Sequence, residues 1–139
     1  MKPTFLWLSL LGLAGACSHG RPAAAPDPAT SVVLRGVVTY RARVALPPGT
    51  RITVRLADVS RADAPATVIA QQLIHASGEQ VPIPFTLSVA RNRLEPGRRY
   101  AVQARVEQAG ELWFLTTAAQ PVDPASWPES MEVIVEHTR

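Results

Sequence analysis

Apolar and polar residues alternate along this chain in short runs closed by glycine or proline, and this pattern limits its fold more than any other feature. Successive side chains of a β-strand point to opposite faces, so a period of two indicates half-buried strands. Between Arg99 and Glu107 the apolar residues Tyr100, Val102, Ala104 and Val106 share one parity. Turn residues such as Pro47–Thr50 separate the runs. The chain is therefore predicted to be all-β.

Seven predicted strands fill the chain from Val32 onward. They cover residues 32–46, 52–56, 68–76, 85–89, 100–107, 112–115 and 131–136. The first is either one half-buried strand or a bent pair, and Gly36 within it indicates a bulge or a close approach of neighbouring backbone. Residues 70–73 could be helical, but the β-branched residues around them favour a strand. We expect a single β-sandwich of about seven strands with Greek-key-like connections over residues 32–139.

The segment Leu94–Tyr100 precedes the fifth predicted strand and resembles a tyrosine corner. In that motif a tyrosine hydroxyl bonds the backbone just upstream, where the chain passes from one sheet to the other. The leucine, the Pro96-Gly97 turn and Tyr100 fall at the positions that the motif requires. The alternative is a tyrosine that merely begins a strand. We expect the corner, and with it a change of sheet before Tyr100.

The N-terminal residues predict export to the cell envelope. Lys2 is followed by the apolar run Phe5–Ala16, and the chain's one cysteine, Cys17, comes directly after it. As a helix the run would be about 18 Å long, too short to span roughly 30 Å of hydrocarbon. Small residues before a cysteine are typical of bacterial lipoprotein signals, so we predict a signal peptide over residues 1–16 and lipidation of Cys17. Because Ala14 stands where such signals usually have leucine, ordinary secretion of a soluble periplasmic protein is the alternative.

Residues 17–31 predict a flexible, lipid-anchored tether. They are small, polar and rich in proline, without an apolar period. Extended, they could reach on the order of 40 Å, which would hold a domain clear of a membrane surface. Ser18 replaces the aspartate that is associated with inner-membrane retention in enteric bacteria. The predicted location is therefore the outer membrane, with the domain facing the periplasm.

Residue types that carry catalysis or hold metals are scattered along the sequence. His19, His75 and His137 have no other ligand near them at metal-binding spacing, and no nucleophile motif occurs. Asp58 and Asp63 could face each other across a loop, as the carboxylates of glycosidases do, but solvation of that loop explains them better. The formal net charge of +3 is too small for a nucleic-acid binder. The sequence thus predicts no catalytic residue, metal, cofactor or nucleic-acid partner.

Two groups of surface residues are candidates for contact with a partner. The first is a set of arginines of equal parity in the first two predicted strands: Arg35, Arg41, Arg43, Arg51 and Arg55. If those strands pair, the arginines form one basic face for anionic lipid headgroups or an acidic partner, and an ordinary solvated face is the alternative. Within this group we single out Arg41 and Arg43.

The second group lies in Leu112–Leu115, four large apolar residues in a row. They cannot all face one side of a sheet, so either both faces are covered or one pair is exposed. If Leu112 and Phe114 fill the core, Trp113 and Leu115 face outward, and Trp113 is the leading contact residue. Trp113 and Trp127 would also serve the alternative function, a small-ligand or glycan site without catalysis.

Several stretches resemble the YbaY-like lipoprotein family. They are Val44–Gly49, Leu56–Pro65, Val68–Gln71, Phe85–Ser88 and Gln120–Val122. The resemblance extends from Leu34 to Val122, nearly the whole predicted domain. That family is similar to the YscW lipoproteins, pilots that bind a secretin subunit and escort it to the outer membrane. The resemblance implies a lipid anchor, a β-sandwich, and a non-catalytic pilot- or chaperone-like function towards a secretin or another envelope protein.

Overall fold

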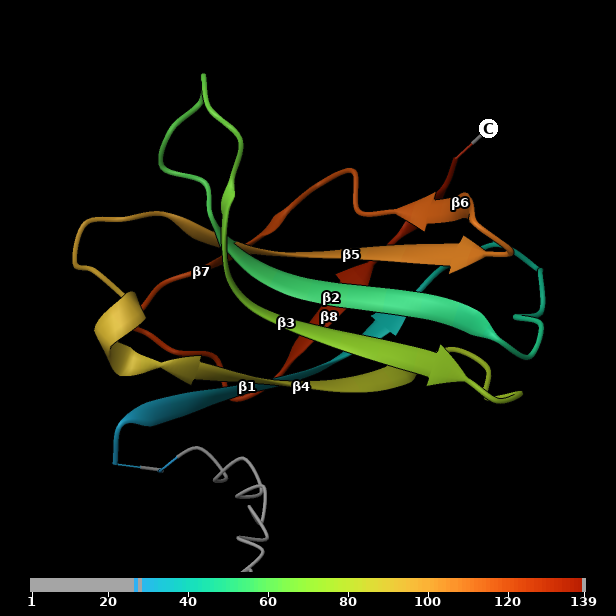
Figure 1. The fold of residues 1–139 in the computed structure, drawn as a ribbon, viewed down its shortest axis with the longest axis horizontal. Coiled ribbons are helices and arrows are strands. Elements are labelled where there is room, and N and C mark those ends of the chain that lie inside the picture. The colour runs from blue at the N-terminus through green and yellow to red at the C-terminus, as the bar shows by residue number, and fades with distance from the viewer. Residues whose placement is uncertain (1–26, 28, 139) are drawn as a thin grey trace, which may run out of the picture.

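The computed structural model describes Asp27 and residues 29–138, and these residues form two packed β-sheets (Figure 1). The strands are β1 (Ser31–Thr39), β2 (Thr50–Asp58), β3 (Thr67–Ala76), β4 (Ile83–Ala90), β5 (Tyr100–Gln108), β6 (Glu111–Leu115), β7 (Gln120–Val122), β8 (Met131–Ile134) and β9 (Glu136–His137). A short 3-10 helix, η1 (Arg91–Arg93), follows β4. The predicted all-β sandwich is confirmed, with nine strands in the described residues instead of about seven. No helix in this part of the chain is long and apolar enough to cross a membrane.

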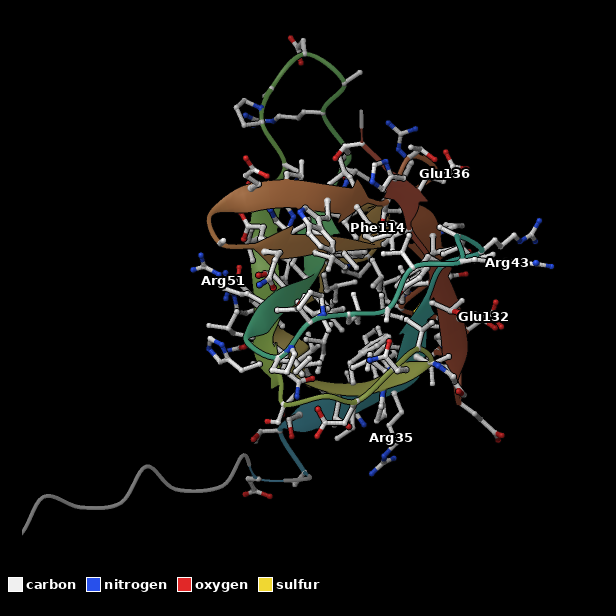
Figure 2. The ribbon with its side chains drawn as sticks, turned by 90° about the vertical axis from the view of Figure 1, so that its right-hand side faces the viewer. Arg35, Arg43, Arg51, Phe114, Glu132 and Glu136 are labelled. Carbon is white, nitrogen blue, oxygen red and sulfur yellow. The ribbon has the colours of Figure 1, made fainter. Side chains whose placement is uncertain are left out.

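The strands divide into a small and a large sheet. In the small sheet the order is β4-β1-β8, with β1 parallel to β8 and antiparallel to β4. In the large sheet the order is β3-β2-β5-β6-β9, all antiparallel, and β7 pairs with one end of β5. Between β8 and β9 the chain passes from the small sheet to the large sheet at Val135. The Val135 N–H donates to the carbonyl oxygen of Thr39 at 2.9 Å. Figure 2 looks along the strands and shows the sheets curving round one core that contains Phe114.

Alternation along the strands decides which side chains enter that core. In β4, Ile83, Phe85, Leu87 and Val89 are buried, and the residues between them are exposed. Burial of one such side chain is worth about 1.5–3 kcal/mol. A slip by one residue would turn every apolar side chain of the strand into water, so the alternation sets the orientation of each strand.

Gly36 lies at a close approach between β1 and its surroundings. A Cβ on this residue would overlap the carbonyl oxygen of Met131 on β8 and would lie 2.7 Å from Cζ of the Phe85 ring. The small sheet therefore closes round β1 only because this position has no side chain. The close approach predicted from the glycine is confirmed.

One side of the sandwich is a seam where β3 of the large sheet lies along β4 of the small sheet. Side chains bridge it: the Gln72 Oε1 atom accepts the Thr86 N–H at 2.7 Å, and the Arg93 guanidinium donates to the carbonyl oxygens of Ile69 and Val68 at 2.7 and 3.2 Å. One N–H of β4 and two carbonyl oxygens of β3 at the seam are thus satisfied without a ladder between the two strands.

The first predicted strand is shorter than the sequence indicates. β1 ends at Thr39, and Arg41–Ala45 form an exposed loop, so the alternation beyond Tyr40 does not mark a strand. The pairing partners of β1 run out at the same place, with Ile83 opposite Val38 and Ile134 opposite Thr39. Tyr40 instead stacks on Phe114, with ring centroids 4.3 Å apart, and its hydroxyl donates to the Val44 carbonyl oxygen at 2.6 Å.

The tyrosine corner is confirmed. The chain passes from β4 of the small sheet to β5 of the large sheet, and Tyr100 at the start of β5 is 2% exposed. Its hydroxyl accepts the Glu95 N–H at 2.8 Å and lies 3.4 Å from the Arg93 carbonyl oxygen. The hydroxyl therefore fixes the path of the connection from inside the core.

Removing this hydroxyl with Tyr100→Phe is expected to lower the free energy of unfolding by about 1–3 kcal/mol, because the Glu95 N–H loses a buried acceptor. Urea unfolding of the mature chain measures the loss. Tyr40→Phe is the matched control, since it also removes a hydroxyl but frees a carbonyl in an exposed loop that water can reach. A loss from Tyr100→Phe no larger than that from the control would contradict the structural role of the corner.

Candidate partner-binding surface

The outer face of the large sheet carries the side chains that alternate with the core. Opposed residues of antiparallel strands point to the same face, so the register shows which residues lie together. Thr53 of β2 lies opposite Leu73 of β3 and Arg105 of β5, and Arg105 lies opposite Leu115 of β6. We call the residues that these four strands turn outward the arginine–leucine face: Arg51, Thr53, Arg55, Gln71, Leu73, His75, Gln103, Arg105, Glu107, Leu112 and Leu115.

Positive charge exceeds negative charge on this face. Glu107 is shared by two arginines, with Arg51 Nε 3.6 Å and Arg105 Nη2 3.0 Å from its carboxylate oxygens. Arg55 donates to the neutral Gln103 Oε1 through Nε at 3.0 Å and Nη2 at 2.8 Å. The outward residues of β2, β3 and β5 thus include three guanidinium groups and one carboxylate. Two positive charges of this face have no counter-charge on these strands.

Two leucines stand at opposite borders of the face. Leu73 on β3 is 48% exposed and Leu115 on β6 is 37% exposed. Side chains of this size are usually turned into a core when a sheet face is amphipathic. Leu115 is on the surface, which is one of the two arrangements that the sequence left open, and its contact with a partner stays a prediction. Leu73 was not named as a contact residue from the sequence. Residues 70–73 could also have been helical, so it was uncertain which of them would face outward in a strand.

Trp113 lies at a β-bulge, which corrects the expectation that it stands on an open sheet face. Val106 of β5 lies opposite Phe114, and the next residue, Glu107, lies opposite Leu112. Trp113 is the extra residue between these pairs, so the parity changes there. Phe114 enters the core, Leu112 turns outward with Glu107, and Trp113 is half-buried and packs against the core.

The arginines predicted to form one basic face are divided among different surfaces. β1 pairs with β4 and β8, whereas β2 pairs with β3 and β5, so the first two strands belong to different sheets. Figure 2 shows Arg35, Arg43 and Arg51 pointing away from the core in three directions. Arg35 lies on the small sheet, and Arg41 and Arg43 lie on the exposed loop after β1. Their contact with a partner remains a prediction, but the single face was wrong.

The sequence and the fold of this chain resemble those of known proteins. The family described as "Type III secretion system lipoprotein chaperone (YscW)" matches residues 29–133, which is more than half of the chain. The chain belongs to the YscW family. This YscW-family chain is 40% identical over 87 residues to the uncharacterized lipoprotein YbaY of Escherichia coli K12. That match covers 63% of this chain and 46% of the E. coli protein, so the chain spans about half the length of that relative.

A solved structure is similar to most of this YscW-family chain. It is the structure of an alternative pilotin from the type II secretion system of Vibrio cholerae, with a TM-score of 0.70 and 40% sequence identity. The match covers 78% of this chain and 99% of the pilotin chain. The resemblance to YbaY- and YscW-like lipoproteins is confirmed. The matched residues 29–133 include all four strands of the arginine–leucine face.

In the described residues of this YscW-family chain, the aromatic side chains considered for ligand binding are engaged in packing. A cavity of about 380 Å³ lies beside Tyr40 and Phe114 and is bordered by Arg41, Glu136 and His137. Phe114 is fully buried and Tyr40 is almost so, which leaves no open ring face for stacking against a sugar. Trp127 donates its indole N–H to the Val33 carbonyl oxygen of β1 at 2.9 Å. Trp113 and Trp127 therefore do not form the concave aromatic site that the glycan-binding alternative requires.

Asp58 and His137, two of the residues considered for chemistry, have other contacts, and His19 lies outside the described residues. Asp58 Oδ1 accepts the Ser60 N–H at 2.9 Å, and Arg98 lies 3.5 Å from its other oxygen. Hydrogen bonds from Ser60, followed by the charge of Arg98, lower the pKa of the Asp58 carboxyl, so it is ionised at neutral pH. His137 packs its ring edge-on against Phe114. Within the described residues, no three His, Cys, Asp or Glu side chains gather as a metal site would require.

The predicted lipidation site lies outside the residues that the structure describes. Cys17, the predicted signal peptide and most of the predicted tether fall in the range 1–26. The first described strand, β1, begins at Ser31, one residue before the predicted start of the domain. Lipidation of Cys17 therefore stays a prediction from the sequence.

Proposed function

We propose that this chain is a lipid-anchored envelope protein, facing the periplasm from the outer membrane, that binds and chaperones a secretin subunit as a pilot does. The observation that carries the proposal is the match to the V. cholerae pilotin, which covers 99% of that chain at 40% identity. The matched family description names a lipoprotein chaperone. Both descriptions refer to binding proteins of secretion systems, which supports a non-catalytic function.

The position of β1 in the fold is compatible with an anchor at Cys17. β1 begins at Ser31 at one end of the sandwich, in the lower left of Figure 1, and not on a sheet face. A tether over residues 17–30 would reach on the order of 40 Å when extended. Anchored in this way, the domain would keep both broad sheet faces free for a partner.

Cys17→Ser is expected to convert the protein from a membrane-bound to a soluble periplasmic form. Several acyl chains would be lost, and each buried CH₂ contributes about 0.8 kcal/mol to membrane binding. Cell fractionation and intact mass of the mature protein measure the change. Ser18→Ala keeps the cysteine and should remain in the membrane, which makes it the matched control. An unmodified Cys17 at the start of the mature wild-type chain, or anywhere within it, would refute lipidation.

The pilot function is tested by the fate of a secretin subunit encoded in the same organism. Deletion of the chain is expected to reduce the secretin multimers in the outer-membrane fraction, and expression of the wild type is expected to restore them. Cys17→Ser is expected to bind the subunit without restoring its location. Normal secretin assembly after deletion, together with no capture of the subunit by the purified full-length chain, would reject the proposal.

A further inference from the structure

The connection from β4 to β5 is rich in arginine. Residues 91–99 contain four arginines, and their net charge is +3 because Glu95 is the single carboxylate among them. We call residues 91–99 the basic corner. We propose that the basic corner docks on anionic lipid headgroups of the membrane that holds the lipid anchor. This inference rests on the anchoring at Cys17 under the proposed function, which would keep the domain next to a membrane surface.

The basic corner lies beside the point where the predicted tether joins the domain. Ser31 at the start of β1 pairs with Ala90, the last residue of β4, and η1 follows directly. The Arg91 N–H donates to the Thr30 carbonyl oxygen at 2.9 Å, so the corner is bonded to the residue that precedes β1. Figure 1 shows η1 and the start of β1 at the same end of the sandwich. A domain anchored through residues 17–30 is thus held from this corner.

Three arginines of the corner have charges that remain available. Arg91, Arg93 and Arg99 are exposed, and no ion pair joins them to a carboxylate in the described residues. Arg93 and Arg99 donate to backbone carbonyl oxygens, which position the side chains without neutralising them. Arg98 differs, because Glu95 and Asp58 lie 3.0 and 3.5 Å from it. Lipid phosphates would supply counter-charges to the exposed guanidinium groups.

The other segments at this end of the sandwich do not add positive charge. Their charged residues are Arg21 and Asp27 in the tether, Arg61 and Asp63 in residues 59–66, and Asp123 and Glu129 in residues 123–130. In Figure 1 the connection between β2 and β3 projects from the upper side of the sandwich, away from η1. The positive charge of this end is therefore concentrated in the corner next to the tether.

The opposite end of the sandwich supplies a matched control. Arg41 and Arg43 lie there in the loop after β1, and Glu79 and Glu111 lie at the same end in the turn before β4 and at the start of β6. β1 has nine residues and is roughly 27 Å long at the usual rise of a strand. The Debye length at 0.15 M salt is about 8 Å, so a membrane that touches the corner is screened from Arg41 and Arg43.

The size of the effect favours an orienting contact and not a second anchor. An arginine close to an anionic surface strengthens binding about fivefold, so three contribute about a hundredfold together. Even a myristoyl chain, with a binding constant of about 10⁴ M⁻¹, gives only marginal membrane binding. The corner would therefore release Cys17→Ser at physiological salt. In the lipidated protein it would turn this end to the membrane and the loop after β1 away from it.

The test uses the full mature chain carrying Cys17→Ser, so that no lipid contributes to binding. It should sediment with vesicles of phosphatidylglycerol and phosphatidylethanolamine in equal parts at about 0.01 M salt, and not with phosphatidylcholine vesicles. Replacing Arg91 and Arg99 by glutamine is expected to weaken binding about 25-fold. The same replacement of Arg41 and Arg43 removes an equal charge and should leave binding within twofold. All four side chains are exposed, so both variants should fold, which thermal unfolding checks.

A gain of charge and a measurement of orientation give two further readouts. Asn92→Arg adds a charge at an exposed position of η1 and should strengthen vesicle binding about fivefold, whereas Ser77→Arg at the opposite end should not. In the lipidated protein, fluorescent probes are placed on Asn92→Cys or Ser77→Cys. Lipids with a quencher on the headgroup should quench the probe at position 92 far more than the probe at position 77.

The outcomes separate this inference from the proposed function. Equal binding to neutral and anionic vesicles, no binding to either, or equal losses from the two arginine pairs would overturn docking by the basic corner. Equal quenching of the two probes would do the same. Each of these results is compatible with a lipidated Cys17 and with capture of a secretin subunit. An unmodified Cys17 would instead remove the anchor, even where the corner binds anionic vesicles.

Discussion

Gly36→Ala is expected to destabilise the domain by about 3 kcal/mol, at the upper end of the cost of overpacking a core. The new methyl group would overlap the Met131 carbonyl oxygen and press on the Phe85 ring. The carbonyl belongs to the backbone of β8 and cannot rotate away as a flexible side chain could. β1 also has strand neighbours on both sides at this point, so a shift of β1 would break pairing with β4 or β8.

Urea unfolding at constant m-value measures this loss, because an unchanged m reports an unchanged extent of surface burial. Ser88→Ala is the control: it changes an exposed residue of the neighbouring strand β4, and we expect less than about 0.5 kcal/mol from it. Equal unfolding midpoints for the two variants would show that the sheet yields at Gly36, which the close packing described above does not allow.

Phe114→Ala is expected to lower the free energy of unfolding by about 3–5 kcal/mol, the range for truncating a buried aromatic residue. Phe114 is fully buried and stacks on Tyr40, with ring centroids 4.3 Å apart. Its ring also makes an edge-type contact with the His137 ring, with centroids 5.2 Å apart. Its loss would leave a cavity and would free both the loop after β1 and strand β9. Chemical unfolding gives the energy, and faster proteolysis in the loop after Thr39 would report the local effect.

The next residue supplies the control for Phe114→Ala. Leu115→Ala removes an apolar side chain from the same strand but from its outer face, and it should cost less than about 1 kcal/mol. This pair of variants tests which side of β6 enters the core at its C-terminal end. Similar losses from both variants would contradict the assigned orientation of β6.

The fold was largely predictable where a local pattern determines the structure. Alternation identified the inward residues of β4 and β5, and the turn before Tyr100 identified the corner and the change of sheet. These features depend on neighbouring residues in the chain, since a strand has a fixed period and the tyrosine corner has a fixed spacing. A period does not name the partner of a strand, which is why β1 and β2 were wrongly considered as a pair.

The candidate surface was only partly predictable for the same reason. Arg51 and Arg55 were identified as outward residues from parity alone, whereas exposure of Leu115 was one of two alternatives left open. Arg105 joins them through the pairing of β5 with both β2 and β6, which is set by the tertiary structure. The bulge at Trp113 inserts one residue without a clear local signal, so parity failed across it. Cys17 and the tether remain predictions from the sequence.

The seam between β3 and β4 has a consequence for self-association. Exposed sheet edges are templates on which a second copy of a chain can add a strand, and lipoproteins confined to one membrane meet their own copies often. Here β3 and β4 lie along each other, Gln72 accepts the Thr86 N–H, Arg93 donates to two carbonyl oxygens of β3, and Pro84 has no N–H to donate. Neither β3 nor β4 therefore presents an open, unobstructed edge along this seam, which disfavours strand addition by a second copy at these two edges.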